Sequence, residues 1–151
     1  MVRISELRDH SEWLATVSDW ILAEWPKPER DRSAVEHRMM GHGPHEGLPL
    51  ALIALEDEAP IGVISLIHHA ESEKIGRPYW VDAVYVLPAF RGRRIASELL
   101  RAAEAKARQL RLPVLFALTD IRAFYEKQGW AAVVGTTAGA TRDVVVSKVF
   151  S

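Results

Sequence analysis

The chain has 151 residues, of which 48% are hydrophobic and 26% charged, and its formal net charge is -1. This length suits one domain, residues 1–151, with a sizeable core. The balanced charge argues against nucleic acid as the main partner, and no basic cluster indicates a membrane surface. The absence of cysteine excludes disulfides and thiolate chemistry. Neither an apolar leader nor an apolar run of ~20 residues is present, so a soluble cytoplasmic protein is expected.

The first third of the chain predicts one short strand and two helices. The strand is expected at residues 2–4, and Asp9 is the expected N-cap of the first helix. Apolar residues then recur at helical spacing: Trp13, Leu14, Val17, Trp20, Ile21 and Leu22. Two prolines end this helix. A charged helix is expected at residues 32–40, and residues 41–47 have the composition of a loop.

The rest of the chain alternates strands with helices. Strands are expected at residues 50–55, 61–68, 79–87, 114–119, 130–134 and 144–150. Residues 71–78 are polar and predict a loop, residues 95–110 predict an amphipathic helix, and a short helix at 121–128 ends at Gly129. This order predicts an α/β fold with a mixed, twisted sheet of about six to seven strands flanked by helices. A right-handed crossover is expected to join two parallel strands, 79–87 and 114–119.

The most informative segment, residues 86–97, joins a strand to the long helix through a basic turn. The first turn of a helix exposes unpaired amides and a partial positive charge, which suits a phosphate group. Gly92 lets the backbone approach a ligand, and Arg91, Arg93 and Arg94 add donors that match phosphate. An ordinary loop with solvated arginines accounts for the same residues equally well.

This segment resembles the acetyl-CoA signature of the GNAT N-acyltransferase superfamily, Arg/Gln-x-x-Gly-x-Gly/Ala. Arg91 fits its first position and Ala96 its last, whereas Arg94 replaces the middle glycine. The resemblance implies acetyl-CoA as co-substrate, held by Val84, Val86, Arg91, Gly92, Arg93, Arg94, Ala96 and Ser97. Since Arg94 lies at the start of the helix, we expect a negative φ there. A positive φ would lower cofactor affinity by something like the ~1–2 kcal/mol cost of a left-handed non-glycine residue.

Residues 123–130 resemble the phenylalanine–tyrosine–x–x–x–glycine–aromatic element that lies downstream in the same superfamily. In that family the matching tyrosine lies near the thioester sulfur, so the resemblance implies that Tyr125 protonates the departing thiolate. A phenol with a pKa of ~10 can supply a proton to a thiolate of similar basicity. The alternative is an amphipathic tyrosine that packs on the sheet with a solvated hydroxyl.

Asp82 interrupts an apolar strand, where aspartate is rare and an unpaired buried carboxylate is costly. The period of two places it on the same face as Val84 and Val86. In the superfamily a carboxylate on this strand often takes the proton from the attacking amine, so the resemblance implies a base. A solvated strand end, or an anchor for a substrate cation, explains Asp82 as well. His68 and His69 end a strand that is expected to border the acceptor site.

Together the motifs predict a GNAT-like fold whose sheet splays between strands 79–87 and 114–119, with acetyl-CoA in the split. The expected reaction is direct acetyl transfer to a primary amine, either a small molecule or a protein N-terminus. A non-catalytic acyl-CoA-binding module is the main alternative, and a nucleic-acid-binding domain that uses the arginines, Arg101 included, is the second. No metal is expected, although His42, His45 and Glu46 have a loose metal-like spacing. The sequence leaves open whether the chain forms a homodimer.

Overall fold

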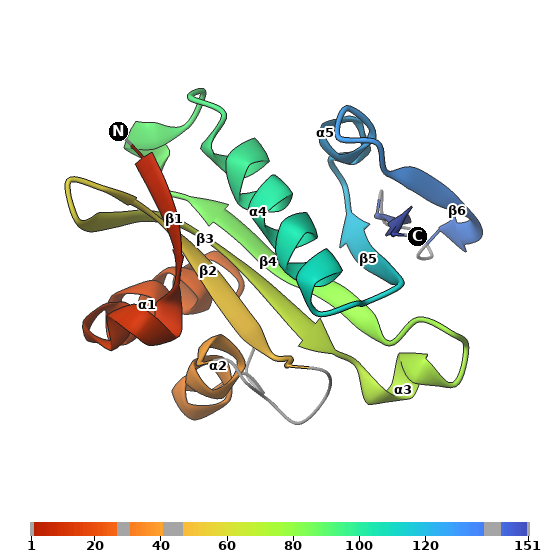
Figure 1. Ribbon diagram of the computed structural model, residues 1–151, viewed down its shortest axis with the longest axis horizontal. Coiled ribbons are helices and arrows are strands. Elements are labelled where there is room, and N and C mark those ends of the chain that lie inside the picture. The colour runs from red at the N-terminus through yellow and green to blue at the C-terminus, as the bar shows by residue number, and fades with distance from the viewer. Residues whose placement is uncertain (1, 27–30, 41–46, 138–142, 151) are drawn as a thin grey trace.

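The computed structural model describes residues 2–26, 31–40, 47–137 and 143–150. Within them, seven strands form one sheet in the order β1-β2-β3-β4-β5-β7-β6 (Figure 1). The strands are β1 (Val2–Glu6), β2 (Leu50–Glu56), β3 (Ala59–His68), β4 (Tyr79–Val86), β5 (Val114–Thr119), β6 (Ala131–Thr137) and β7 (Val144–Val149). The α-helices are α1 (Leu14–Glu24), α2 (Arg32–Met39), α3 (Ala70–Glu73), α4 (Ile95–Gln109) and α5 (Arg122–Glu126). The predicted α/β class with a mixed sheet is confirmed.

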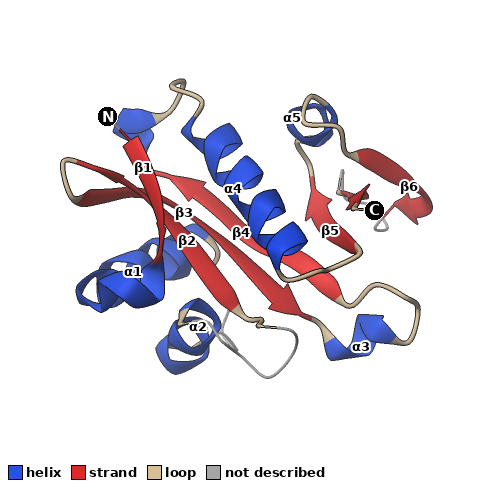
Figure 2. Cartoon of the chain, in the orientation of Figure 1, coloured by secondary structure: helices blue, strands red, loops and turns tan. Residues whose placement is uncertain are grey.

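Helices cover both faces of the central strands (Figure 2). Alternate residues of β2 point into two cores: Leu52 packs in a cluster with α4, and Ile53 packs in a cluster with α1 and α2. This alternation follows from the period of two in a strand that is buried on both faces. None of the helices in the described ranges combines the length and the hydropathy that a bilayer-spanning helix requires.

Two local predictions are wrong. Asp9 does not cap α1: it lies in a 3-10 segment, η1 (Leu7–Trp13), which is kinked at His10, and α1 begins only at Leu14. The reason is that Leu7 is fully buried, so the chain enters the core before the helix starts. The polar segment predicted as a loop contains α3, whose first turn is capped by the His69 ring accepting from the Ser72 amide at 3.3 Å.

The strand β4 contains a β-bulge at Asp82. Ser65 of β3 lies opposite Ala83, but the next residue, Leu66, lies opposite Val81, so Asp82 is an extra residue without a partner. Because of the bulge, Val81 and Ala83 pack in different core clusters although they are two positions apart. The prediction that Asp82 shares a face with the following valines is therefore wrong, since it assumed an unbroken period of two.

The sheet opens between β4 and β5, as predicted. These two strands are parallel, and the described residues pair only at Trp80 with Phe116 and Val81 with Ala117. All other neighbouring strands are antiparallel. From the bulge onward, β4 therefore pairs with β3 on one edge but with no described strand on the edge that faces β5.

Candidate active site

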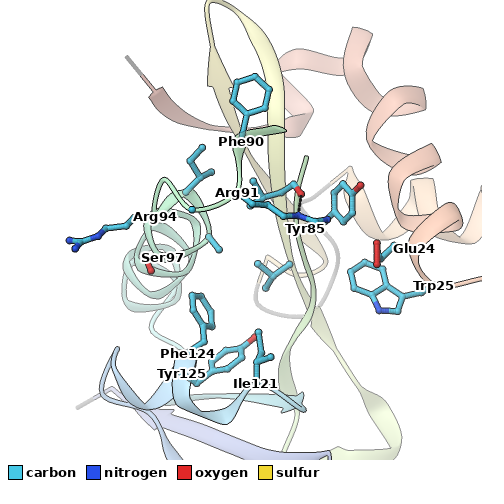
Figure 3. Close-up of a pocket in the computed structure, with 15 residues that line it drawn as sticks. Glu24, Trp25, Tyr85, Phe90, Arg91, Arg94, Ser97, Ile121, Phe124 and Tyr125 are labelled. Carbon is cyan, nitrogen blue, oxygen red and sulfur yellow. Dashed lines mark hydrogen bonds between the residues drawn. The ribbon is translucent and has the colours of Figure 1, made fainter. Parts of the chain in front are cut away.

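A cavity of about 390 Å³ lies where β4 and β5 separate. Its lining comes from the end of α1, the second half of β4, the turn before α4, and α5 (Figure 3). Of the residues predicted to hold the donor, seven line it: Val84, Val86, Arg91, Gly92, Arg94, Ala96 and Ser97. Tyr125 lines it as well. The predicted donor residues and the predicted acid therefore meet at one cavity.

The helix α4 begins at this cavity without a side-chain cap. Its first backbone bond runs from the Glu98 amide to the Arg94 carbonyl at 3.1 Å, so the amides of Ile95, Ala96 and Ser97 have no intrahelical acceptor. These amides and the positive end of the helix dipole suit an anion such as a pyrophosphate. Gly92 has a φ of 83°, a left-handed conformation that glycine adopts without steric cost.

The three arginines of the turn lie apart. The Arg91 Nε atom donates to the Val86 carbonyl at 2.9 Å, which ties the turn to the end of β4. Arg93 does not line the cavity, because its guanidinium pairs with Glu56 at 2.5 Å. The Arg94 side chain points away from the other lining residues (Figure 3). The three guanidinium groups therefore do not converge, and the first amides of α4 are the groups of this turn that suit an anion.

The prediction of a negative φ at Arg94 is wrong. Arg94 has φ 63° and ψ 21°, in the left-handed region, whereas an N-cap residue usually has extended angles. An arginine in this conformation bears a strain of ~1–2 kcal/mol, which a glycine at this position would avoid.

Replacing Arg94 with glycine is expected to stabilise the protein. Glycine relieves the left-handed strain but gives up ~0.5–1 kcal/mol through the greater freedom of the unfolded chain. The expected net gain in the free energy of unfolding is up to about 1 kcal/mol, measured by urea denaturation. Arg93→Gly is the control: Arg93 has no positive φ and loses its Glu56 partner, so stability should fall. An Arg94→Gly protein less stable than wild type would contradict the strain at this position.

Tyr125 is buried, with 5% of its surface exposed. Its ring packs edge-on against Phe124 and Trp130, with centroids 5.1 Å and 5.2 Å away. Burial raises the pKa of Tyr125 to about 12, because the phenolate would lose its hydration. The phenol therefore keeps its proton at physiological pH, and burial makes it a weaker proton donor than a solvated tyrosine.

The position of Tyr125 depends on how α5 ends. Gly129 has a φ of 91°, and its amide donates to the Glu126 carbonyl at 3.0 Å. The Trp130 amide donates to the Tyr125 carbonyl at 3.1 Å, which completes a Schellman motif. The predicted helix end at Gly129 is confirmed.

A second cavity, of about 580 Å³, adjoins the first. Four residues line both cavities: Trp25, Val84, Ile121 and Tyr125. The second cavity is acidic, since Asp82, Asp120 and Asp143 line it and no lysine or arginine is among its described lining residues. His69 also lines it, whereas His68 does not and lies 3.6 Å from Glu73. Two cavities of different character therefore meet at Tyr125.

Asp82 forms an ion pair that the sequence did not reveal. Both of its carboxylate oxygens lie 3.4 Å from Nη1 of Arg38, in the last turn of α2. The Asp82 side chain is only 17% exposed, which excludes a solvated strand end. The ion pair adds a structural account of Asp82, a link between β4 and α2, to the predicted roles of base and substrate anchor.

Within the described residues, no three histidine, aspartate or glutamate side chains converge in a way that could hold a metal ion. The spacing noted at His42, His45 and Glu46 lies outside the described residues. Trp25 lines both cavities, and Trp13, Trp20 and Trp25 all pack against the core cluster on the α1 side of the sheet.

The sequence matches the model of the acetyltransferase (GNAT) family over residues 14–130. This match spans most of the chain, so the protein belongs to the GNAT family of acetyltransferases, and the resemblance seen in the sequence is confirmed. Comparison with curated protein sequences gave no significant match.

Several solved structures share the fold. An aminoglycoside 6'-N-acetyltransferase complexed with coenzyme A superposes with a TM-score of 0.75 at 19% identity, over 97% of this chain and 96% of that one. Naa50 of Arabidopsis thaliana, in complex with a bisubstrate analogue, gives 0.67 at 20% identity, over 99% of both chains. PaiA of Thermoplasma acidophilum, in complex with coenzyme A, gives 0.69 at 19% identity, also over 99% of both. At these identities the likeness establishes the fold alone.

Proposed function

We propose that this protein transfers an acetyl group from acetyl-CoA to a primary amine while both substrates are bound. The observation that carries the proposal is the pair of cavities that meet at Tyr125, one with free helix amides and the other lined by carboxylates. A CoA thioester needs a site for its pyrophosphate, and an amine that arrives as an ammonium ion needs negative charge. Structures of the same fold in complex with coenzyme A support the donor assignment.

Acetyl-CoA supplies an acyl group that its thioester has already activated. The amides at the start of α4 hold the pyrophosphate, and the unpaired edge of β4 after the bulge offers amides to the pantetheine arm and to the thioester carbonyl. The amine nitrogen bonds to the carbonyl carbon and the carbon–sulfur bond breaks. The ammonium form of the acceptor gives up one proton to Asp82 or to water before it attacks. Tyr125 gives its proton to the sulfur, and the second proton, which the nitrogen loses as the amide forms, passes through water to the Tyr125 phenolate.

The second cavity favours a small cationic acceptor. Its volume of about 580 Å³ lies within the ~300–1,000 Å³ range of small-molecule sites. Asp82, Asp120 and Asp143 attract ammonium groups, although Arg38 offsets part of the charge of Asp82. An amine with a second positive charge can form ion pairs with more than one of these carboxylates at once.

A screen with acetyl-CoA that follows released thiol tests this function. We expect a linear diamine to be a better acceptor than the monoamine of equal chain length, with a severalfold higher kcat/KM. Thermal stabilisation by acetyl-CoA without thiol release from any acceptor would instead identify a non-catalytic binding module. Equal rates for diamine and monoamine would leave acetyl transfer standing and reject the cationic acceptor.

Asp82→Asn keeps the shape of the side chain and removes its charge. We expect the KM for the amine to rise while kcat changes little, because Asp82 lines the acceptor cavity and does not line the donor cavity. Steady-state kinetics over a range of pH measures both constants. A kcat that falls most at low pH, and recovers as free amine accumulates, would contradict the anchor role and identify Asp82 as the base. Unaltered kinetics would exclude both roles.

A further inference from the structure

A buried carboxylate on α4 lies outside both cavities. Glu104 is 4% exposed, and both of its oxygens are engaged. Oε1 accepts from Nζ of Lys148 at 2.8 Å, and Oε2 accepts from Nε1 of Trp130 at 2.9 Å. Lys148 is 21% exposed, so the pair is partly withdrawn from water, and apolar replacements of such pairs are often no less stable. Stability alone therefore gives no strong reason for a charged pair at this place.

One oxygen of Glu104 is linked to Tyr125 through Trp130, and the other is linked to it through Lys148 and Gln128. Lys148 Nζ also donates to the Gln128 carbonyl at 2.7 Å, and the Gln128 amide donates to the Tyr125 carbonyl at 2.9 Å. The Trp130 indole packs against the Tyr125 ring at an interplanar angle of 67°. The helix α5 has only five residues, too few to be stable by itself, so its placement depends on such outside contacts.

We propose that Glu104 is a positioning residue for Tyr125, an inference that rests on the proposed acetyl transfer. The same helix, α4, presents its free amides to the donor cavity at one end and Glu104 further along. Glu104 therefore fixes the position of Tyr125 relative to α4, the helix proposed to bind acetyl-CoA. This positioning matters because a shift of about 1 Å at a reacting group can cost ~10²-fold in rate.

A double-mutant cycle with Tyr125 tests this coupling. Glu104→Gln keeps an oxygen for the Trp130 indole and removes the charge that holds Lys148. We expect kcat to fall about tenfold while the KM for acetyl-CoA stays the same. In a Tyr125→Phe background, where the hydroxyl is already absent, the same change should lower kcat no further. An equal loss in both backgrounds would overturn the proposal.

A second variant separates positioning from stability. Glu104→Gln combined with Lys148→Met leaves no unpaired charge in the protein interior, so its urea midpoint should lie near that of wild type. We expect its kcat to stay low. A kcat that returns to the wild-type value together with stability would show that the pair only maintains the fold. Glu12→Gln, at an exposed glutamate that lines neither cavity, is the control and should change neither quantity.

These outcomes are distinct from failure of the proposed function. If wild-type protein releases thiol and Glu104→Gln does so at the same rate, only the positioning role is rejected. If wild-type protein releases no thiol with any amine, the proposed function itself is rejected.

Discussion

Replacement of Tyr125 by phenylalanine is expected to lower kcat by about 10²–10⁴-fold while the Kd for acetyl-CoA stays nearly the same. The change removes one hydroxyl and almost no volume, so the ring contacts with Phe124 and Trp130 remain. The thiolate would then leave without an acid. Steady-state thiol release measures kcat, and thermal denaturation with acetyl-CoA measures donor binding. Tyr79→Phe, at a tyrosine that lines neither cavity, should leave kcat unchanged.

The leaving group distinguishes acid catalysis from positioning. A donor whose thiol has a lower pKa needs less protonation, so the loss in Tyr125→Phe should shrink with such a donor. If the variant is slowed equally with both donors, Tyr125 orients the substrates and does not protonate the sulfur. Near-normal rates with both donors would mean that the tyrosine only packs.

The pH dependence follows from the same residue. Burial raises the pKa of Tyr125 to about 12, so the acid form persists to high pH and is lost only as the pH approaches that value. The amine acceptor, in contrast, becomes reactive as it loses its proton. We therefore expect kcat to rise with pH and then level off. A decline between about pH 8 and pH 10 would contradict Tyr125 as the acid, because a phenol with this pKa is still protonated there.

Gly92→Glu is expected to abolish the stabilisation of the protein by acetyl-CoA. A ligand present at about 100 times its Kd adds about 2.7 kcal/mol to the free energy of unfolding. A glutamate at Gly92 places bulk and negative charge beside the free amides that start α4, where the pyrophosphate is proposed to lie. Thermal denaturation with and without acetyl-CoA measures the effect.

Two controls separate charge from backbone strain in this test. Gly92→Ala adds a Cβ at the same φ of 83° without a charge, so the ligand-induced shift should survive. Gly76→Glu adds the same side chain at a φ of 74° in the loop between α3 and β4, and the shift should survive there too. An added Cβ meets no atom within 4 Å at either glycine, so both positions test conformation and charge without a clash. An undiminished shift in Gly92→Glu would remove the anion site from this turn.

Local signals in the sequence determined the fold class and the location of the site. The period of the apolar residues predicted the strands and α4, and the glycine after α5 predicted where that helix ends. The turn before α4 and the Phe124–Tyr125 segment carried the family resemblance, because each is a short contiguous stretch whose residues act together. Seven of the eight predicted donor residues accordingly line one cavity.

Only the tertiary structure decided which side chains are partners. Asp82 pairs with Arg38, 44 residues earlier, and Arg93 pairs with Glu56, 37 residues earlier, and Arg93 does not line the cavity at the start of α4. Glu104 reaches Trp130 and Lys148 on elements that are 26 and 44 residues further on. Such contacts arise when strands and helices pack, and no periodicity along the chain records them. The bulge at Asp82 is also a tertiary feature, because it depends on the register between β3 and β4. A shift of one residue reverses the face to which every following side chain points.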